Sequence, residues 1–501
     1  CNSHRRNEVM SQPIDRPEHD SILESHIKAV QESEQVSFHM PGHKGGQGAP
    51  ARGRRLLGDA VYSADLSELS GFDYLHGAKS ALADAQQHAA QLFQSDQTWF
   101  LVNGATVGNI AAICSVVGDG DAFLVARDSH RSVYAGIALA GARPIYLAPA
   151  HNDALDGLFG IKLNELEGAL AMHPEVKALH VTCPSYYGFT IPLHAIVKLA
   201  HDRDIPVIVD EAHGSHFIFD DRFPDSALTC GADLVVQSPH KTLGSLTQSS
   251  LLHQKGDRID RAKVSANLSM LQSSSPSAIL LLSLDLAVDE MKLYGHERWQ
   301  EVMTLTQLVR REISAIERVQ VYGDEVIGSP GISGYDPTKI VIDVDQLGTT
   351  GFAAGRWLHE EWKINPEFSD LRRMVFSITL GDSEQSAQVL IDAIRALGEN
   401  RHLFEAHPNL ISLWPGVLPA ERMSPRQAQQ SKSISIATAK AIGSISAEMI
   451  VPYPPGVPLL VAGEEISREV VDSMIQLFGS GCRIVGLADP TGDTLRVVCE
   501  D

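Results

Sequence analysis

The chain has 501 residues and a formal net charge of −21 at pH 7, with 44% hydrophobic and 21% charged residues. Its length and composition predict a globular protein of about three domains. The negative charge argues against a nucleic-acid partner, and no apolar run reaches the roughly 18–20 residues that a membrane span needs. Because the N-terminal residues lack the apolar centre of a secretory signal, we expect a cytoplasmic protein.

The first 30 residues are polar, and we expect them to form an irregular N-terminal arm. From about residue 85 to residue 250, short apolar runs alternate with segments of helical apolar spacing. This alternation predicts βαβ units and a mostly parallel sheet in a large domain over residues 31–320. The expected strands are 99–102, 123–126, 145–147, 178–182, 206–209 and 234–236.

Two smaller units follow the large domain. Apolar runs at 339–344 and 373–380, each followed by a helix-like segment, predict a small α/β domain over residues 321–400. The Pro-rich stretch 451–465 cannot form a regular helix, so we expect an ordered loop within a C-terminal domain over residues 401–501. The expected fold class is therefore α/β throughout.

Chemically useful residues follow three of the predicted strands. The turn 103–106 follows the first strand, Asp210 follows the fifth and Lys241 follows the sixth. Ligands of open parallel sheets bind beyond the carboxyl ends of the strands. We therefore expect a carboxylate, a lysine and a glycine-containing turn to face one binding site.

Pyridoxal phosphate needs what these three positions offer. Its aldehyde bonds to a lysine amine, its ring nitrogen stays protonated beside a carboxylate, and its phosphate binds N–H and hydroxyl groups at a helix N-terminus. Each feature alone also fits a structural role, such as a surface lysine, a helix cap or a loop. Together and in this order they favour the cofactor, held by Lys241, Asp210, Gly104, Ala105 and Thr106, with Ser238 and His240 as further phosphate contacts.

The segment VQSPHKTLGSLTQSS, residues 236–250, resembles the lysine signature of the bacterial Orn/Lys/Arg decarboxylase family. The resemblance spans nearly the whole chain from about residue 20 and matches the short form of the family, which lacks an extra N-terminal domain. Other segments resemble the family in the same order: 38–45 (FHMPGHKG), 65–69 (DLSEL), 103–106 (NGAT), 127–132 (RDSHRS), 184–187 (PSYY), 210–216 (DEAHGSH), 274–277 (SSPS) and 454–464 (PPG through GE).

This resemblance implies a pyridoxal-phosphate enzyme of fold type I, in which Lys241 bonds to the cofactor and Asp210 pairs with its ring nitrogen. It also implies that His130 stacks on the ring and that His213 lies beside it. Such enzymes build their active sites at the interface of a homodimer or larger homo-oligomer. The implied phosphate ligands are Ala105, Thr106, Ser238 and His240, with Ser274 reaching the phosphate of the partner subunit.

The implied reaction is the decarboxylation of a small cationic amino acid. Arginine, which would give agmatine, stands ahead of lysine and ornithine because the short form is most often linked to arginine. Another reaction on the same scaffold, such as aminotransfer or Cα–Cβ cleavage, stays open, as does a catalytically silent binding homologue. The candidate acids for the distal cation are Glu367, Glu464 and Glu465, and the candidate Cα proton donors are Lys241 and His240.

Two positions depart from the family pattern. Ala105 stands where relatives often carry a hydroxyl, and Ala278 stands where many have Tyr. The letters DEAH at 210–213 also spell a helicase box, but the chain has no GxxxxGK[ST] phosphate loop. Neither the histidines nor the six cysteines show a metal-binding spacing, so we expect no metal site and free thiols.

Overall fold

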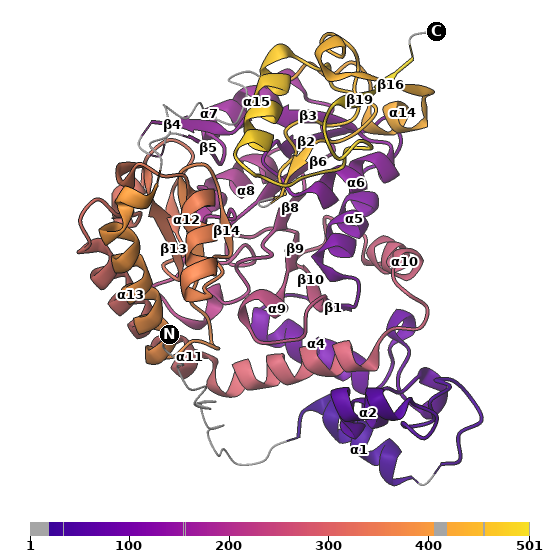
Figure 1. The fold of residues 1–501 in the computed structure, drawn as a ribbon. Coiled ribbons are helices and arrows are strands. Elements are labelled where there is room, and N and C mark those ends of the chain that lie inside the picture. Colours follow the sequence, from indigo (N-terminus) through magenta and orange to yellow (C-terminus); the bar gives the residue numbers. More distant parts are fainter. Residues whose placement is uncertain are drawn as a thin grey trace.

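The computed structural model describes residues 20–33, 35–153, 155, 157–404, 418–453 and 456–499. Three groups of elements are visible in Figure 1: a large central unit, a smaller unit beside it and a C-terminal unit above it. The expected α/β class is confirmed. We propose that these three units are separate domains, with the boundaries near residues 320 and 400 that the sequence predicted.

A mixed, mostly parallel sheet of seven strands forms the centre, in the order β1-β10-β9-β8-β6-β2-β3. Strands β3, β2, β6, β8 and β9 are parallel, whereas β10 runs antiparallel between β9 and β1. All six expected strands are present, and β10 is an additional one. Their bounds are β1 Gln97–Leu101, β2 Ala122–Ala126, β3 Arg143–Leu147, β6 Ala178–Thr182, β8 Val207–Asp210, β9 Leu234–Gln237 and β10 Ser250–Gln254.

Helices cover both faces of this sheet, which explains why its strands read as continuous apolar runs. Alternate residues of β9 illustrate this, because Val235 belongs to the core on one face and Val236 to the core on the other. A Cβ on Gly108 of α5 would lie 2.9 Å from side-chain atoms of Leu101 and Val236, so this helix packs closely on the sheet. The covering helices include α4 Ala81–Phe93, α5 Gly104–Val116, α6 Arg131–Ala140, α7 Leu163–Met172, α8 Leu193–His201 and α10 Arg261–Leu271.

The N-terminal segment is more regular than expected. Residues 1–19 of the expected arm lie outside the described residues, but α1 (Ile22–Glu32) is a helix that begins at a capping box formed by Ser21 and Glu24. Its apolar face is buried, with Leu23 fully enclosed. The expectation of an irregular arm is therefore wrong for residues 22–30, where the capping signal was overlooked.

The smaller unit is an antiparallel sheet in the order β11-β13-β15-β14, packed against helices α12 (Gly351–Trp357) and α13 (Glu384–Glu399). The 37-residue helix α11 (Ala278–Ser314) runs along the lower side of the molecule and contacts both α4 and α13 (Figure 1). The strands are β11 Gln320–Val321, β13 Lys339–Asp343, β14 Phe368–Ser369 and β15 Arg373–Ser377. Strand β13 begins with Lys339, a buried lysine.

The C-terminal unit packs over α6 and the parallel edge of the large sheet (Figure 1). A buried ion pair joins the two, because Arg127 and Glu464 lie 3.0 Å apart and are each 1% exposed. The Pro-rich stretch forms the short strand β17 and then irregular buried backbone, with residues 454 and 455 outside the described set. Its elements are α14 Pro425–Gln430, β16 Ser433–Ala437, β17 Val451–Pro452, α15 Arg468–Gly479, β18 Ile484–Val485 and β19 Thr494–Val498.

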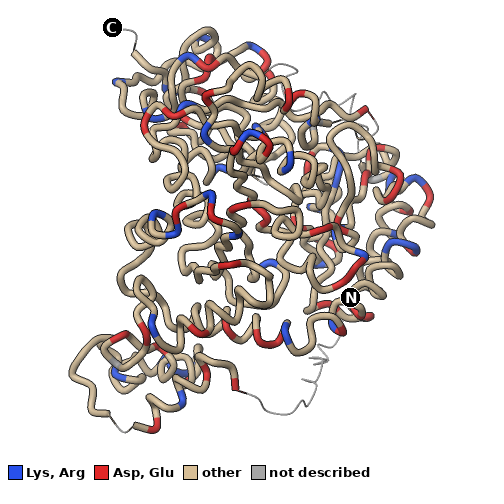
Figure 2. Tube along the Cα trace, turned by 180° about the vertical axis from the view of Figure 1, so that it is seen from behind, with Lys and Arg blue, Asp and Glu red and all other residues tan. Residues whose placement is uncertain are grey.

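Acidic and basic residues are interspersed along the chain (Figure 2). None of the described helices, α11 included, is long and apolar enough to cross a membrane.

Candidate active site

A cavity of about 280 Å³ lies at the carboxyl ends of the central strands, beside the N-terminus of α5. It is the place where the sequence predicted a ligand to bind. All but one of the predicted site residues line it, and Ser274 is the exception. The predicted residues that line the cavity are Gly104, Ala105, Thr106, His130, Asp210, His213, Ser238, His240 and Lys241.

Asp210, the last residue of β8, is held rigidly at the floor of the cavity. Its side chain is 4% exposed and accepts hydrogen bonds from Asn109 Nδ2 at 2.8 Å and from the Ala212 N–H at 3.1 Å. Asn109 Nδ2 also donates to Ser132 Oγ at 3.0 Å. Asn109 is not among the site residues predicted from the sequence, although it lies in the helix that the glycine turn opens. Asn109 thus links the carboxylate to the start of α6.

Lys241 lies in α9 (Pro239–Thr242), a single helical turn that follows β9. Its Nζ is 3.1 Å from His213 Nε2. Partial burial lowers the pKa of Lys241, and the nearby Lys339 ammonium lowers it further, whereas Asp210 and Glu367 act in the opposite direction. The amine is therefore easier to deprotonate than that of an exposed lysine.

Two histidines flank this lysine and carboxylate. His130 is the N-cap of α6, and its Nδ1 is contacted by the Ser132 N–H at 3.3 Å and by Ser132 Oγ at 2.9 Å. Burial lowers the pKa of His130 to about 4 and that of His213 well below 6.5. Both rings are neutral at pH 7. Tyr186 lies beside both, with its ring centroid 6.5 Å from His130 and 5.3 Å from His213.

The N-terminus of α5 is open toward the cavity. Asn103 precedes the helix, but its side chain does not cap it and accepts from the Ser273 N–H instead. Gly104 has φ +74°, a left-handed conformation that suits glycine. The first N–H groups of a helix without a side-chain cap form an anion-binding site. Nearby, His240 donates through Nδ1 to the Ser249 carbonyl at 2.6 Å, which leaves Nε2 for another partner.

The cavity offers polar atoms that still need partners. Asn109 Oδ1 and Thr182 Oγ1 are buried and have no hydrogen-bond partner among the described residues, and both residues line the cavity. Buried polar atoms of this kind are normally satisfied, so they indicate a polar ligand. A lysine amine, a carboxylate and an open helix end around one cavity fit pyridoxal phosphate.

Known proteins with the same sequence pattern identify the family. Residues 23–386 match the family "Orn/Lys/Arg decarboxylase, major domain", and residues 412–482 match "Orn/Lys/Arg decarboxylase, C-terminal domain". This chain belongs to the Orn/Lys/Arg decarboxylase family. It is a pyridoxal-phosphate-dependent enzyme, and the predicted family and cofactor are confirmed.

Individual relatives cover nearly the whole of this decarboxylase-family chain. An arginine decarboxylase of Bacillus subtilis (strain 168) is 36% identical over 96% of this chain and 99% of its own length. A lysine decarboxylase of Pseudomonas aeruginosa is 25% identical over 87% of this chain and 73% of its own. The structure of a Francisella novicida lysine decarboxylase shares the fold, with a TM-score of 0.82 at 23% identity, over 96% of this chain and 81% of that one.

Ser274 is not among the residues that line the cavity. It is exposed in the loop between α10 and α11. The neighbouring residue Ser273 donates its N–H to Asn103 Oδ1 at 3.3 Å, so the loop approaches the open end of α5 without entering the cavity. The other departure from the family pattern, Ala278, is fully buried at the start of α11.

The three candidate acids for a distal substrate cation differ in availability. Glu464 accepts from both Nε and Nη2 of Arg127 in a buried pair, and Glu465 pairs with Arg422 at 2.6 Å. Glu367 is exposed, and its side chain makes no hydrogen bond or ion pair with the described residues. Its charge raises the pKa of both Lys241 and Lys339. Glu367 is therefore the free carboxylate near the lysine.

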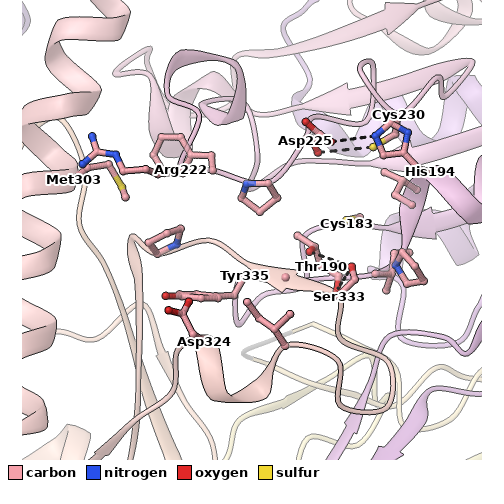
Figure 3. A pocket seen from close by; sticks show the side chains of 18 of the residues that line it. Cys183, Thr190, His194, Arg222, Asp225, Cys230, Met303, Asp324, Ser333 and Tyr335 are labelled. Carbon is pink, nitrogen blue, oxygen red and sulfur yellow. Dashed lines mark hydrogen bonds and ion pairs between the residues drawn. The ribbon is translucent and has the colours of Figure 1, made fainter.

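A second cavity, of about 780 Å³, is lined by residues that include Cys183, Arg222 and Tyr335 (Figure 3). None of the predicted cofactor residues and no lysine are among the described residues that line it. Of its charged groups, His194 contacts Asp225 at 3.0 Å and Arg222 pairs with Asp220 at 2.5 Å. Arg310 donates to the carbonyls of Pro337, Tyr322 and Lys339. The smaller cavity is the candidate active site.

Proposed function

We propose that this enzyme removes the α-carboxylate of a basic amino acid as CO₂ and releases the corresponding amine. Arginine is the first candidate substrate, and agmatine would be its product. The observation that carries the proposal is the meeting of Lys241, Asp210 and the open end of α5 around one cavity in a chain of this family. Lysine and ornithine are the alternatives within the family.

The proposed roles follow from the contacts described above. Lys241 would supply the amine that holds the cofactor, and Asp210 would keep a proton at the pyridine nitrogen. His130 and His213, both neutral, would lie beside the ring without adding charge. When bound, pyridoxal phosphate accepts the electron pair that departing CO₂ leaves behind. The phosphate ligands would be the N–H groups of Gly104, Ala105 and Thr106, together with Ser238 and His240.

The identities of the relatives support arginine over lysine. The arginine decarboxylase relative is 36% identical to this chain, whereas the lysine decarboxylase relative is 25% identical. A guanidinium is a planar fork that prefers a carboxylate facing it, and Glu367 is an acid near the lysine without a partner among the described residues. We propose that Glu367 binds the distal cation of the substrate.

The experiment is a substrate panel with purified holoenzyme. Arginine, lysine and ornithine are supplied separately, amines are identified by mass spectrometry, and kcat/KM is measured for each. We expect agmatine and CO₂ from arginine with the highest kcat/KM. A clear preference for lysine or ornithine would overturn the arginine assignment, and release of a keto acid without CO₂ would overturn the decarboxylase assignment.

The role of Glu367 is tested by its amide. Glu367→Gln should raise KM for arginine far more than it lowers kcat, because the lost contact is made in both the ground state and the transition state. Glu360→Gln, which changes another exposed acid of the same unit, is the matched control and should leave KM unchanged. An unchanged KM in Glu367→Gln would assign the distal cation to another group.

We also propose a homodimer, located in the cytoplasm, in which Ser274 reaches the phosphate of the partner subunit. The N-terminal part around α2 (Ala51–Leu57) projects from the lower right of Figure 1 and exposes unusually many apolar side chains. Exposed apolar groups in such number mark an interaction surface. They are Val36, Phe38, Met40, Leu56, Leu57 and Leu69. Light scattering on active holoenzyme should give the mass of a dimer or of a multiple of a dimer. The double change Phe38→Asp with Leu56→Asp should weaken the association of the subunits. A fully active monomer would contradict this proposal.

A further inference from the structure

A second lysine lies on the opposite side of His213 from Lys241. Lys339 is the first residue of β13 and is only 3% exposed. Its Nζ lies 2.6 Å from Ser377 Oγ and 3.4 Å from His213 Nδ1. It does not line the cavity of the candidate active site. His213 is thus held between two lysine amines, one open to the cavity and the other sealed behind it.

The surroundings of Lys339 are built to hold its side chain. Gly188, with φ +85°, packs against it so closely that a Cβ there would lie 2.8 Å from Lys339 Cβ and 2.7 Å from Cγ. Asp336, three residues earlier and fully buried, supplies the opposite charge. Burial lowers the pKa of Lys339, whereas Asp336 and then Glu367 raise it. A buried ammonium needs such a partner and an acceptor, and Ser377 Oγ is the acceptor.

The contacts of His213 fix the position of its proton. An ammonium group has three donors and no acceptor, and a neutral imidazole has one donor nitrogen and one acceptor nitrogen. If Lys339 is charged, His213 Nδ1 must accept from it, and the ring proton must lie on Nε2. That Nε2–H then points at Lys241 Nζ, 3.1 Å away. This contact is a hydrogen bond only when the Lys241 amine is uncharged and offers its lone pair.

The opposite assignment of charge is less favourable. Within the described part of the chain, His213 is the only hydrogen-bond partner of Lys241 Nζ, whereas Lys339 also has Ser377 Oγ. A neutral His213 cannot accept from two ammonium groups through one nitrogen. The pKa of Lys241 is affected by the charges of Asp210, Lys339 and Glu367. The pKa of Lys339 is affected by Asp336 and Glu367. The pKa of His213 is affected by Lys241, Lys339, His130 and His216.

We propose that Lys339 is a positioning residue that keeps the proton of His213 on Nε2 and thereby keeps the Lys241 amine uncharged. The uncharged Nζ uses its lone pair to attack the cofactor aldehyde. A carbon–nitrogen double bond forms, and the two protons of the amine leave with the aldehyde oxygen as one water molecule. This inference rests on the proposed role of Lys241, and it assigns to a residue of the small sheet the control of a nucleophile on the large one.

The test measures the reactivity of Lys241 in full-length protein from which the cofactor has been removed. Limited acetylation with acetic anhydride at a series of pH values, followed by peptide mass spectrometry, gives the apparent pKa of Lys241. Lys339→Met should raise this pKa, because it removes a cation and frees His213 to accept from a Lys241 ammonium. Each unit of increase lowers labelling below the pKa about tenfold. Unchanged labelling of Lys241 in folded Lys339→Met protein would overturn the proposal.

Three further variants separate the proton relay from a loss of structure. Lys339→Arg keeps the cation and should retain reactivity near that of the unchanged protein; behaviour like Lys339→Met would contradict the role of charge. Ser377→Ala removes only the acceptor of Lys339, so it should also raise the apparent pKa of Lys241, but by less than Lys339→Met. If Lys339→Met does not fold, Ser377→Ala serves as the test. Lys177→Met changes an exposed lysine and should have no effect.

A direct readout of the proton is also available. Nitrogen-15 spectra of histidine-labelled protein should show His213 protonated at Nε2 and unprotonated at Nδ1, and Lys339→Met should remove this preference. A proton on Nδ1 in the unchanged protein would overturn the proposal. None of these measurements requires turnover, so they remain decisive even if another lysine proves to hold the cofactor.

Discussion

Two lysines within reach of the same histidine differ in almost everything else. Lys241 stands at the carboxyl end of β9 in the large sheet and opens into the cavity, with His213 as its hydrogen-bond partner. Lys339 stands at the start of β13 in the small sheet, sealed behind His213 and supplied with an acceptor and a counter-charge. Burial lowers the pKa of both amines. The partners, and not burial alone, decide which lysine is the nucleophile and which is the fixed cation.

The largest expected effect is the difference between replacing Lys241 and replacing Lys339 by alanine. Lys241→Ala should abolish turnover and the visible absorbance of the bound cofactor, because Lys241 is the one lysine among the described residues that line the cavity. Lys339→Ala should retain the absorbance and part of the turnover. Activity and the absorbance spectrum of both purified variants check this. Comparable loss of cofactor in the two variants would show that the lysines share one role.

Two buried carboxylates at opposite ends of neighbouring strands, Asp210 at the carboxyl end of β8 and Asp233 before the amino end of β9, allow a second comparison. Asp210→Asn should retain cofactor but lower kcat by about 100-fold or more, the scale expected when one preorganised electrostatic partner is removed. Asp233, as deeply buried but directly before β9, is the matched control. It binds the Val207 N–H and His201. Asp233→Asn should lower stability without this loss of kcat. Near-normal kcat in Asp210→Asn would assign that carboxylate another role.

The buried pair of Arg127 and Glu464 should be important for stability and not for the reaction. Breaking a buried pair leaves one charge uncompensated and typically costs about 3–5 kcal/mol. Arg127→Met should therefore lower the unfolding free energy by about that amount. The double change Arg127→Met with Glu464→Leu should recover most of it. Denaturant unfolding of the single and double variants measures the difference, and a double variant as unstable as the single one would contradict this account.

The last prediction concerns pH and Glu211, the neighbour of Asp210 that points away from the cavity toward Gln237 and the Ala227 N–H. Burial raises its pKa from 4.5 to about 8. The folded state therefore holds this proton more tightly than the unfolded state. The resulting stabilisation is complete below pH 4.5 and is lost as pH rises toward 8, by at most about 1.4 kcal/mol per pH unit. Glu211→Gln should flatten the decline of Tm between pH 5 and 8; an unchanged slope would contradict the shift.

Much of the large sheet and its cavity could be predicted from the sequence, because both follow from local patterns. Apolar runs locate the parallel strands, and the residues that follow them, such as Lys241 and Asp210, must meet at one edge. Strand β10 was missed because its polar ends, Ser250 and Gln254, hide a short apolar centre. The contacts of Lys339 with His213 and of Glu464 with Arg127 join segments far apart in the chain. No local pattern encodes such pairs, so the sequence indicated no role for Lys339 and left Glu464 as one of three candidate acids for the substrate cation.

The central claim is that the cofactor is held by Lys241, although Lys339 approaches the same histidine. Reduction of the holoenzyme with borohydride, followed by proteolysis and mass spectrometry, fixes the pyridoxyl group on the lysine that carries it. We predict that the label lies on Lys241 alone, in the segment that follows β9. A label on Lys339, or on any other lysine, would contradict the account.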